Sequence, residues 1–241
     1  MDILDAIAAA FASMSLKAIP VRGTVSLNHK KTPVFSRDAV PEYPLIVTRA
    51  DIDISKFKQK LLDMPQEMWD DENQEGNVKI IRPAHDKWGI KKIIFTFCDD
   101  FMMKVLDLPW SMDESWSSLL LPIYDAINVD QSKVVRCLLA SMPPGVTIPV
   151  HHDTGEWVKY THRIHVPIIT GPEVEFLVGP NETDIISYAI EEGHIYELNN
   201  QAKHAVTNGM TDRYRVHLIL DYVESFPIKR YPVLVGDGWS D

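Results

Sequence analysis

The sequence predicts a mainly β fold, a double-stranded β-helix (the cupin-like jelly roll) supported by helices. From residue 132 onward, short β-rich runs alternate with turn signals about every 8 to 12 residues. The turn signals include Pro143-Pro144-Gly145, Gly171-Pro172 and Asn208-Gly209. Strands at this spacing favour a sandwich or barrel over alternating strands and helices. The number of runs fits the roughly eight strands of a jelly roll.

The predicted core spans residues 131–225, within a chain that we expect to form a single domain over residues 1–241. We interpret residues 226–241 as a C-terminal tail. The predicted strands are the runs VVRCLLASM, TIPVHH, HRIHVPII, VEFLV, HIYEL, AVTN and YRVHLILDYV.

Residues 1–130 are expected to form a helical and extended region that supports this core. Apolar residues recur at helical spacing in residues 1–14, and residues 15–45 are predicted to wrap over another surface. A helix is predicted from Ser55, which can cap its first turn, to about Met64. Strands are predicted at Val78–Ile81 and Ile90–Phe97. A second helix is predicted over Asp113–Ile127, with a bend at Pro122.

Composition and charge exclude several classes of protein. The formal net charge is −10, which argues against nucleic acid or an anionic membrane as a partner. No apolar stretch approaches the roughly 20 residues of a transmembrane helix. Cys98 and Cys137 lie in apolar runs and are predicted to be buried thiols outside any disulfide. Because the first residues also lack the positive charge of a signal peptide, we expect a cytoplasmic protein. The sequence does not reveal the oligomeric state.

Histidines are concentrated in the predicted core, where seven of the nine lie between residues 151 and 217. In an extended segment alternate residues point to the same face, so His151 and Asp153 are presented together while His152 points away. His204 follows a turn-like segment and opens a later apolar run. Two histidines and one carboxylate can occupy one face of an octahedral Fe(II) and leave open positions. The pattern predicts a metal site formed by His151, Asp153 and His204.

A predicted strand downstream of His204 carries Arg213 and Arg215 on one face. A guanidinium that points into an apolar interior needs a carboxylate partner, because an unpaired buried charge is costly. A dicarboxylate such as 2-oxoglutarate would supply a bidentate partner. An internal ion pair with Asp221 or Glu197 is the alternative, and the pattern alone leaves both open.

Taken together, these residues resemble the aspartyl/asparaginyl β-hydroxylase family of Fe(II)/2-oxoglutarate oxygenases over roughly residues 132 to 224. Gly145 lies six residues before His151, as in the family's M-x-P-G…H segment. Arg163 and His165 match the family's R-x-H motif. The resemblance implies that these two residues help to hold 2-oxoglutarate.

The later part of the resemblance includes Gly193, which precedes His204 by the family's eleven residues. Arg215 aligns with the arginine of the family's R-x-x-x-x-x-D strand, which favours it over Arg213. The resemblance implies that Arg215 pairs with the far carboxylate of 2-oxoglutarate, and that Fe(II) and O2 complete the set of cofactors.

The chain departs from the family pattern near the expected substrate pocket. The animal enzyme that names the family has glycine in place of Asp153, whereas many bacterial and viral relatives keep the carboxylate. A family serine is replaced by Ala140, and the segment between the first histidine and R-x-H is about three residues longer. Trp157 and Tyr160 in that segment either line a substrate pocket or pack against the helical half. These differences bear on the substrate more than on the chemistry.

The resemblance implies a 2-oxoglutarate-dependent dioxygenase that hydroxylates an amino acid, an amino-acid derivative or a peptide side chain. Relatives that halogenate usually have a small residue in place of Asp153, so hydroxylation or desaturation is expected. Two alternatives remain. One is a cupin-like metal enzyme that does not use 2-oxoglutarate, and the other is a non-catalytic ligand-binding β-domain with structural histidines.

Overall fold

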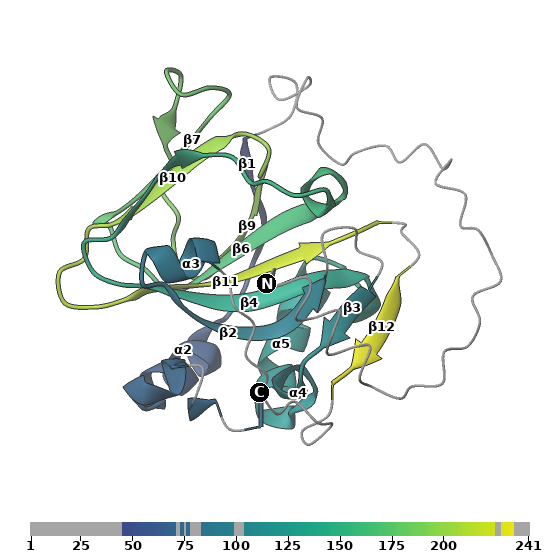
Figure 1. Ribbon diagram of the computed structural model, residues 1–241. Coiled ribbons are helices and arrows are strands. Elements are labelled where there is room, and N and C mark those ends of the chain that lie inside the picture. Colours follow the sequence, from purple (N-terminus) through teal and green to yellow (C-terminus); the bar gives the residue numbers. More distant parts are fainter. Residues whose placement is uncertain are drawn as a thin grey trace, which may run out of the picture.

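The computed structural model describes residues 45–70, 73–74, 76–77, 83–98, 104–224 and 228–233 (Figure 1). The predicted helix at residues 1–14, the extended stretch up to residue 44 and the predicted strand Val78–Ile81 lie outside these ranges. Among the described residues, no helix is long and apolar enough to cross a membrane. The cytoplasmic location stays a prediction.

The described chain consists mainly of β-strands, with its α-helices between β1 and β4. The helices are α2 (Ser55–Asp63), α3 (Pro83–Lys87), α4 (Pro109–Met112) and α5 (Glu114–Ala126), with short 3-10 turns at Gln66–Trp69, Gln131–Lys133 and Trp157–Tyr160. The strands are β1 (Ile46–Asp51), β2 (Lys91–Cys98), β3 (Lys104–Asp107), β4 (Val134–Met142), β5 (Thr147–His151), β6 (His162–Ile169), β7 (Val174–Gly179), β8 (Ile186–Ser187), β9 (His194–Leu198), β10 (Lys203–Asn208), β11 (Arg215–Tyr222) and β12 (Lys229–Pro232).

Strands β4 to β11 cross back and forth between two sheets. The larger sheet has the order β1-β9-β6-β11-β4-β2-β3-β12, and the smaller has the order β5-β10-β7-β8. The neighbouring strands of this core pair antiparallel. Two facing sheets with this strand exchange define a jelly roll. The predicted fold class, mainly β with a double-stranded β-helix core and supporting helices, is confirmed.

Helices α2, α4 and α5 cover one face of the larger sheet (Figure 1). Trp116 of α5 packs in the middle of this layer, with its ring centroid 5.3 Å from that of Phe95 and 5.5 Å from that of Trp110. The helix begins where Asp113 accepts a hydrogen bond from the backbone N–H of Ser115, which satisfies one of the free N–H groups of a helix start. The predicted helix Asp113–Ile127 is therefore confirmed.

The opposite face of the larger sheet packs against the smaller sheet. Ile219 of β11 and Phe176 of β7 belong to one apolar cluster that joins the two sheets. Because side chains alternate along a strand, every second residue from Ile219 points into the same interior. The charged and imidazole side chains that share this inner face on β6 and β11 are Arg163, His165, Arg215, His217 and Asp221.

The residues outside the predicted core also contribute strands to the larger sheet. β2 confirms the predicted strand Ile90–Phe97, and α2 confirms the predicted helix from Ser55. The predicted cap is not formed, because Ser55 is the first helical residue and its side chain makes no capping hydrogen bond. The short strands β1, β3 and β12 were not predicted. β12 lies in the segment interpreted as a tail and pairs parallel with β3. Its sequence, KRYP, has the charges and proline typical of an edge strand, which conceal the β pattern.

Two neighbouring leucines of α5 test the packing of the helical layer. Leu120 is 2% exposed and Leu121 is 42% exposed. We expect Leu120→Ala to lower the free energy of unfolding by roughly 2 to 5 kcal/mol, because it leaves a cavity in the layer. The matched change Leu121→Ala is expected to cost less than about 0.5 kcal/mol. Urea denaturation of both variants measures the difference, and equal losses would contradict this packing.

Candidate metal and anion site

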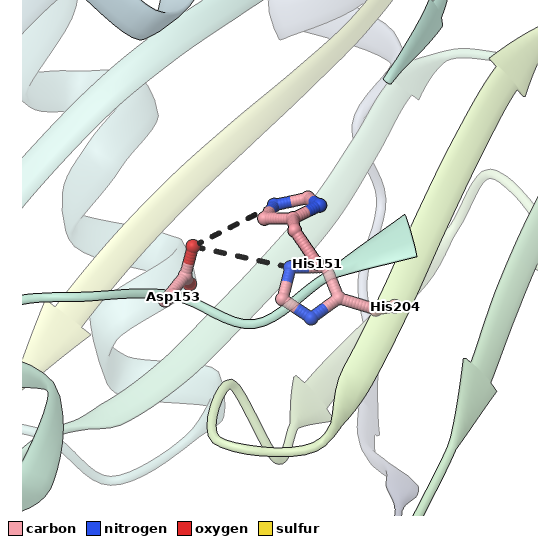
Figure 2. A group of neighbouring side chains, drawn as sticks. All are labelled: His151, Asp153 and His204. Atoms are coloured by element: carbon pink, nitrogen blue, oxygen red, sulfur yellow. Dashed lines mark ion pairs between the residues drawn. The ribbon is translucent and has the colours of Figure 1, made fainter. Parts of the chain in front are cut away.

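The structure brings His151, Asp153 and His204 together at one end of the smaller sheet (Figure 2). His151 ends β5, and His204 lies directly opposite it on β10 in the antiparallel register. Asp153 follows β5, and its backbone N–H donates to the carbonyl of Asn200 at 3.1 Å. The Oδ1 atom of Asp153 lies 3.9 Å from Nε2 of each histidine. Three ligand-type atoms from two strands therefore face one point.

Both imidazole rings are oriented by backbone carbonyls. Nδ1 of His151 lies 2.8 Å from the carbonyl oxygen of Pro149, and Nδ1 of His204 lies 3.0 Å from that of Ala202. A ring whose Nδ1–H donates to a carbonyl keeps a lone pair on Nε2. Backbone partners of this kind commonly fix the tautomer of metal-binding histidines. Both Nε2 atoms thus point toward Asp153 in the form that binds a metal.

The protonation states also suit metal binding. Burial lowers the pKa of His204 to about 4, so this ring is neutral near pH 7. Burial would raise the pKa of Asp153, but the positive charge of Arg163, followed by the two neighbouring histidines, outweighs it and lowers this pKa to about 2. The carboxylate is therefore ionised. A neutral imidazole and an ionised carboxylate are the forms that coordinate cations.

Arg163 of β6 lies between two carboxylates. Its Nε and Nη2 atoms donate to Oδ1 and Oδ2 of Asp221 at 2.8 and 2.9 Å, and its Nη1 atom donates to Oδ2 of Asp153. Burial would lower the pKa of Arg163, but Asp153 and Asp221 outweigh it and raise this pKa. The sequence motif predicted that Arg163 helps to hold 2-oxoglutarate, and the structure places its guanidinium against the candidate metal ligand.

Arg215 of β11 has no such partner. It is 4% exposed, and burial alone lowers its pKa, to about 9. Its Nη2 atom donates to Nδ1 of His217 at 2.8 Å, which leaves the proton of His217 on Nε2. Neither Nε of Arg215 nor Nε2 of His217 has a hydrogen-bond partner within the described residues. These two neighbouring side chains therefore each keep a buried N–H donor without an acceptor in the described residues.

His165 lies between this pair and the candidate metal ligands. Both of its ring nitrogens are buried and lack a hydrogen-bond partner in the described parts of the chain. Burial, followed by the charges of Arg163 and Arg215, lowers the pKa of His165 well below its ordinary value. Its ring centroid lies 5.8 Å from that of His217. His165 therefore lies near His217 and within the electrostatic influence of Arg215 and of the candidate ligands Asp153 and His204.

The structure separates the two arginines that parity had placed on one face. β11 begins only at Arg215. The side chain of Arg213 is 57% exposed, and its Nε atom lies 3.5 Å from Oδ1 of Asp212. The two carboxylates considered as internal partners of Arg215 bind elsewhere. Asp221 accepts from Arg163, and Glu197 accepts from Arg49.

Trp157 packs inside the protein and does not line an open pocket. It is buried, and the guanidinium carbons of Arg136 and Arg163 lie 3.9 and 5.0 Å from its ring centroid. Tyr160 packs against the same small apolar cluster. No role was assigned to His217 from the sequence, and Asp221 was considered only as a possible partner of Arg215. Their places opposite Ala140 and Arg163 depend on strand register, which a single sequence does not display.

A jelly roll that carries a two-histidine, one-carboxylate group and a buried arginine without a carboxylate partner defines a class of candidate non-haem metal enzymes. Residues 118–225 match the model of the aspartyl/asparaginyl beta-hydroxylase family. This match, over somewhat less than half of the chain, confirms the resemblance seen in the sequence. No protein of curated function matches the sequence significantly.

Several solved structures are similar at low identity. An oxidoreductase of the 2OG-Fe(II) oxygenase family from Burkholderia pseudomallei is 15% identical, with a TM-score of 0.43, over 59% of this chain and 70% of that one. A prolyl-4-hydroxylase from Pseudomonas putida is 13% identical, with a TM-score of 0.44, over 79% and 97%. A prolyl hydroxylase from Trichoplax adhaerens is 10% identical, with a TM-score of 0.47, over 78% and 86%.

The buried His217 predicts an acid-sensitive fold. Burial, followed by the charge of Arg215, lowers the pKa of His217 well below its ordinary value. Its contribution to stability is complete above the unfolded pKa of about 6.5 and is lost as the pH falls below it. We expect the free energy of unfolding to fall by up to about 1.4 kcal/mol per pH unit from this group. Urea denaturation between pH 7 and pH 5 should show a shallower slope for His217→Gln, and identical slopes would contradict the assignment.

Proposed function

We propose that this protein is an Fe(II)/2-oxoglutarate-dependent dioxygenase that hydroxylates an amino acid, an amino-acid derivative or a peptide side chain. The observation that carries the proposal is the buried guanidinium of Arg215, which has no carboxylate partner among the described residues, in a jelly roll that also brings His151, Asp153 and His204 together. Each feature alone is compatible with other functions. Together they match a metal and a dicarboxylate cosubstrate that bind side by side.

The donor set fits Fe(II). His151, Asp153 and His204 would hold the ion through two imidazole nitrogens and one carboxylate oxygen, a set that leaves positions open on an octahedral metal. The retained carboxylate Asp153 adds a negative charge that a two-histidine site would lack. When bound, Fe(II) with 2-oxoglutarate supplies the activation of O2 that hydroxylation requires.

The cationic pocket fits the cosubstrate. Arg215 would form a bidentate ion pair with the far carboxylate of 2-oxoglutarate, which compensates its buried charge. His217 accepts from Arg215 through Nδ1, and its Nε2–H group would offer a further donor. His165, which the family resemblance also assigns to the cosubstrate, has two unpartnered nitrogens between this pocket and the metal ligands. Phe176 packs beside both groups, with its ring centroid 5.7 Å from that of His165 and 5.8 Å from the guanidinium carbon of Arg215.

Turnover of 2-oxoglutarate tests the proposal. Protein purified without oxygen is analysed for metal and then incubated with Fe(II), O2 and 2-oxoglutarate in the presence of a panel of amino acids and peptides. We expect about one iron per chain and succinate formation that a substrate of the panel stimulates. Bound metal with no succinate under any condition would favour a cupin-like enzyme that does not use 2-oxoglutarate. A protein that binds no metal would favour a non-catalytic domain.

The neighbouring histidines 151 and 152 give a matched test of the metal ligands. We expect His151→Ala to weaken Fe(II) binding on the order of a hundredfold, since it removes one of the three protein donors. His152→Ala should leave the affinity close to that of the wild type. Asp153→Gly should also weaken binding, because it removes the charged ligand. Anaerobic competition with a chelator measures these affinities, and equal affinity in Asp153→Gly would count against Asp153 as a ligand.

The two arginines 213 and 215 give a matched test of the cosubstrate site. Arg215→Met is expected to raise the KM for 2-oxoglutarate on the order of a hundredfold, because a buried bidentate ion pair is worth about 2 to 5 kcal/mol. Fe(II) affinity should change little. Arg213→Met removes an exposed guanidinium and should leave the KM unchanged. An unchanged KM in Arg215→Met would exclude this arginine as the carboxylate partner.

A further inference from the structure

A line of ion pairs leads from the candidate metal ligands into the larger sheet. Asp153 bonds to Arg163, and Arg163 bonds through two nitrogens to Asp221. Arg163 and Asp221 are opposite each other in the antiparallel register of β6 and β11. The three side chains are 18%, 11% and 2% exposed. The line therefore becomes more buried with distance from the metal site.

The two oxygens of Asp153 are directed to different partners. Oδ1 faces both histidines, at 3.9 Å from each Nε2, while Oδ2 accepts the hydrogen bond from Nη1 of Arg163. Because one oxygen is occupied, the carboxylate is set to bind a cation through the other. The bidentate bond to Asp221 fixes the plane of the guanidinium. Asp221 thereby determines, through Arg163, how Asp153 faces the metal.

Charge gives Asp221 a second role. A guanidinium bonded to Asp153 alone would neutralise its charge and weaken the attraction of the site for a divalent cation. Asp221 offsets the charge of Arg163, so the two carboxylates and one guanidinium retain a single negative charge. Arg163 can then orient Asp153 without cancelling the charge that the metal needs.

We propose that Arg163 and Asp221 are positioning residues of the metal site: they hold Asp153 as a one-oxygen ligand and preserve its negative charge for the cation. The proposal rests on the proposed metal site formed by His151, Asp153 and His204. It assigns Arg163 to the metal carboxylate, whereas the family motif assigns it to 2-oxoglutarate. It gives Asp221, at the end of β11, a function at a site on the other sheet.

Binding of Co²⁺ to the full chain tests the proposal without turnover. The ion is titrated into metal-free protein, and its visible absorption reports both affinity and coordination geometry. We expect Asp221→Asn to weaken Co²⁺ binding roughly 10- to 100-fold, as changes to the outer shell of a metal site commonly do, and to alter the absorption spectrum. Asp221→Glu, which keeps the charge, should recover part of the affinity and serves as the second variant if Asp221→Asn fails to fold.

A second bidentate pair in the same sheet provides a matched control. Arg230 of β12 donates through Nε and Nη2 to the carboxylate of Asp107 on β3, at the edge remote from the metal site. Asp107→Asn removes an equivalent carboxylate and should leave Co²⁺ binding and its spectrum unchanged. If both variants lose stability but neither changes Co²⁺ binding, Asp221 is merely structural and the proposal is wrong.

The double variant Arg163→Gln/Asp221→Asn tests the charge argument. It removes one positive and one negative charge, so the charge of the site returns to that of the wild type. We expect it to bind Co²⁺ more tightly than Asp221→Asn alone. A double variant no tighter than the single one would contradict the charge-preserving role. Wild-type protein that fails to bind Co²⁺ would instead contradict the proposed metal site itself.

Discussion

The cost of burying charge between two sheets governs this structure. The inner face of the larger sheet carries Arg163 and Arg215 in an interior that is otherwise mostly apolar, where an uncompensated charge is expensive. The fold compensates the first with two carboxylates, Asp153 and Asp221. Within the described chain, the fold supplies no carboxylate partner for Arg215. This difference between two arginines on adjacent strands is the reason for proposing that Arg163 orients a metal ligand and that Arg215 binds an anion.

The two sheets of the jelly roll provide different groups of the candidate site. The smaller sheet brings His151 and His204 face to face because β5 and β10 are neighbours. The larger sheet supplies the charged and imidazole groups of β6 and β11. The bond between Asp153 and Arg163 joins these halves. Asp153, in the segment that follows β5, and Asp221 on β11 lie more than sixty positions apart in the chain and are thus connected through Arg163.

Much of this arrangement could be predicted from the sequence because it depends on local patterns. The alternation of β-rich runs with turn signals predicted the core strands. The alternation of side chains along a strand predicted that His151, and not His152, faces the same side as Asp153. Parity alone could not separate Arg213 from Arg215, since the strand begins between them. The roles of Asp221 and His217 could not be predicted, because they depend on which residues lie opposite them across the sheet. The edge strand β12 was not predicted, because charged residues and a proline interrupt the apolar pattern that is typical of a strand.

Anaerobic titration of the Fe(II)-loaded protein with 2-oxoglutarate tests the central claim most directly. Chelation of ferrous iron by a 2-oxo acid produces a visible charge-transfer absorption, which neither component shows alone. The account predicts that this absorption grows to saturation at about one 2-oxoglutarate per chain, and that a monocarboxylate analogue without the far carboxylate binds much more weakly. Absence of the absorption from iron-loaded protein, or equal binding of the two acids, would contradict the placement of a metal beside an anion pocket built on Arg215.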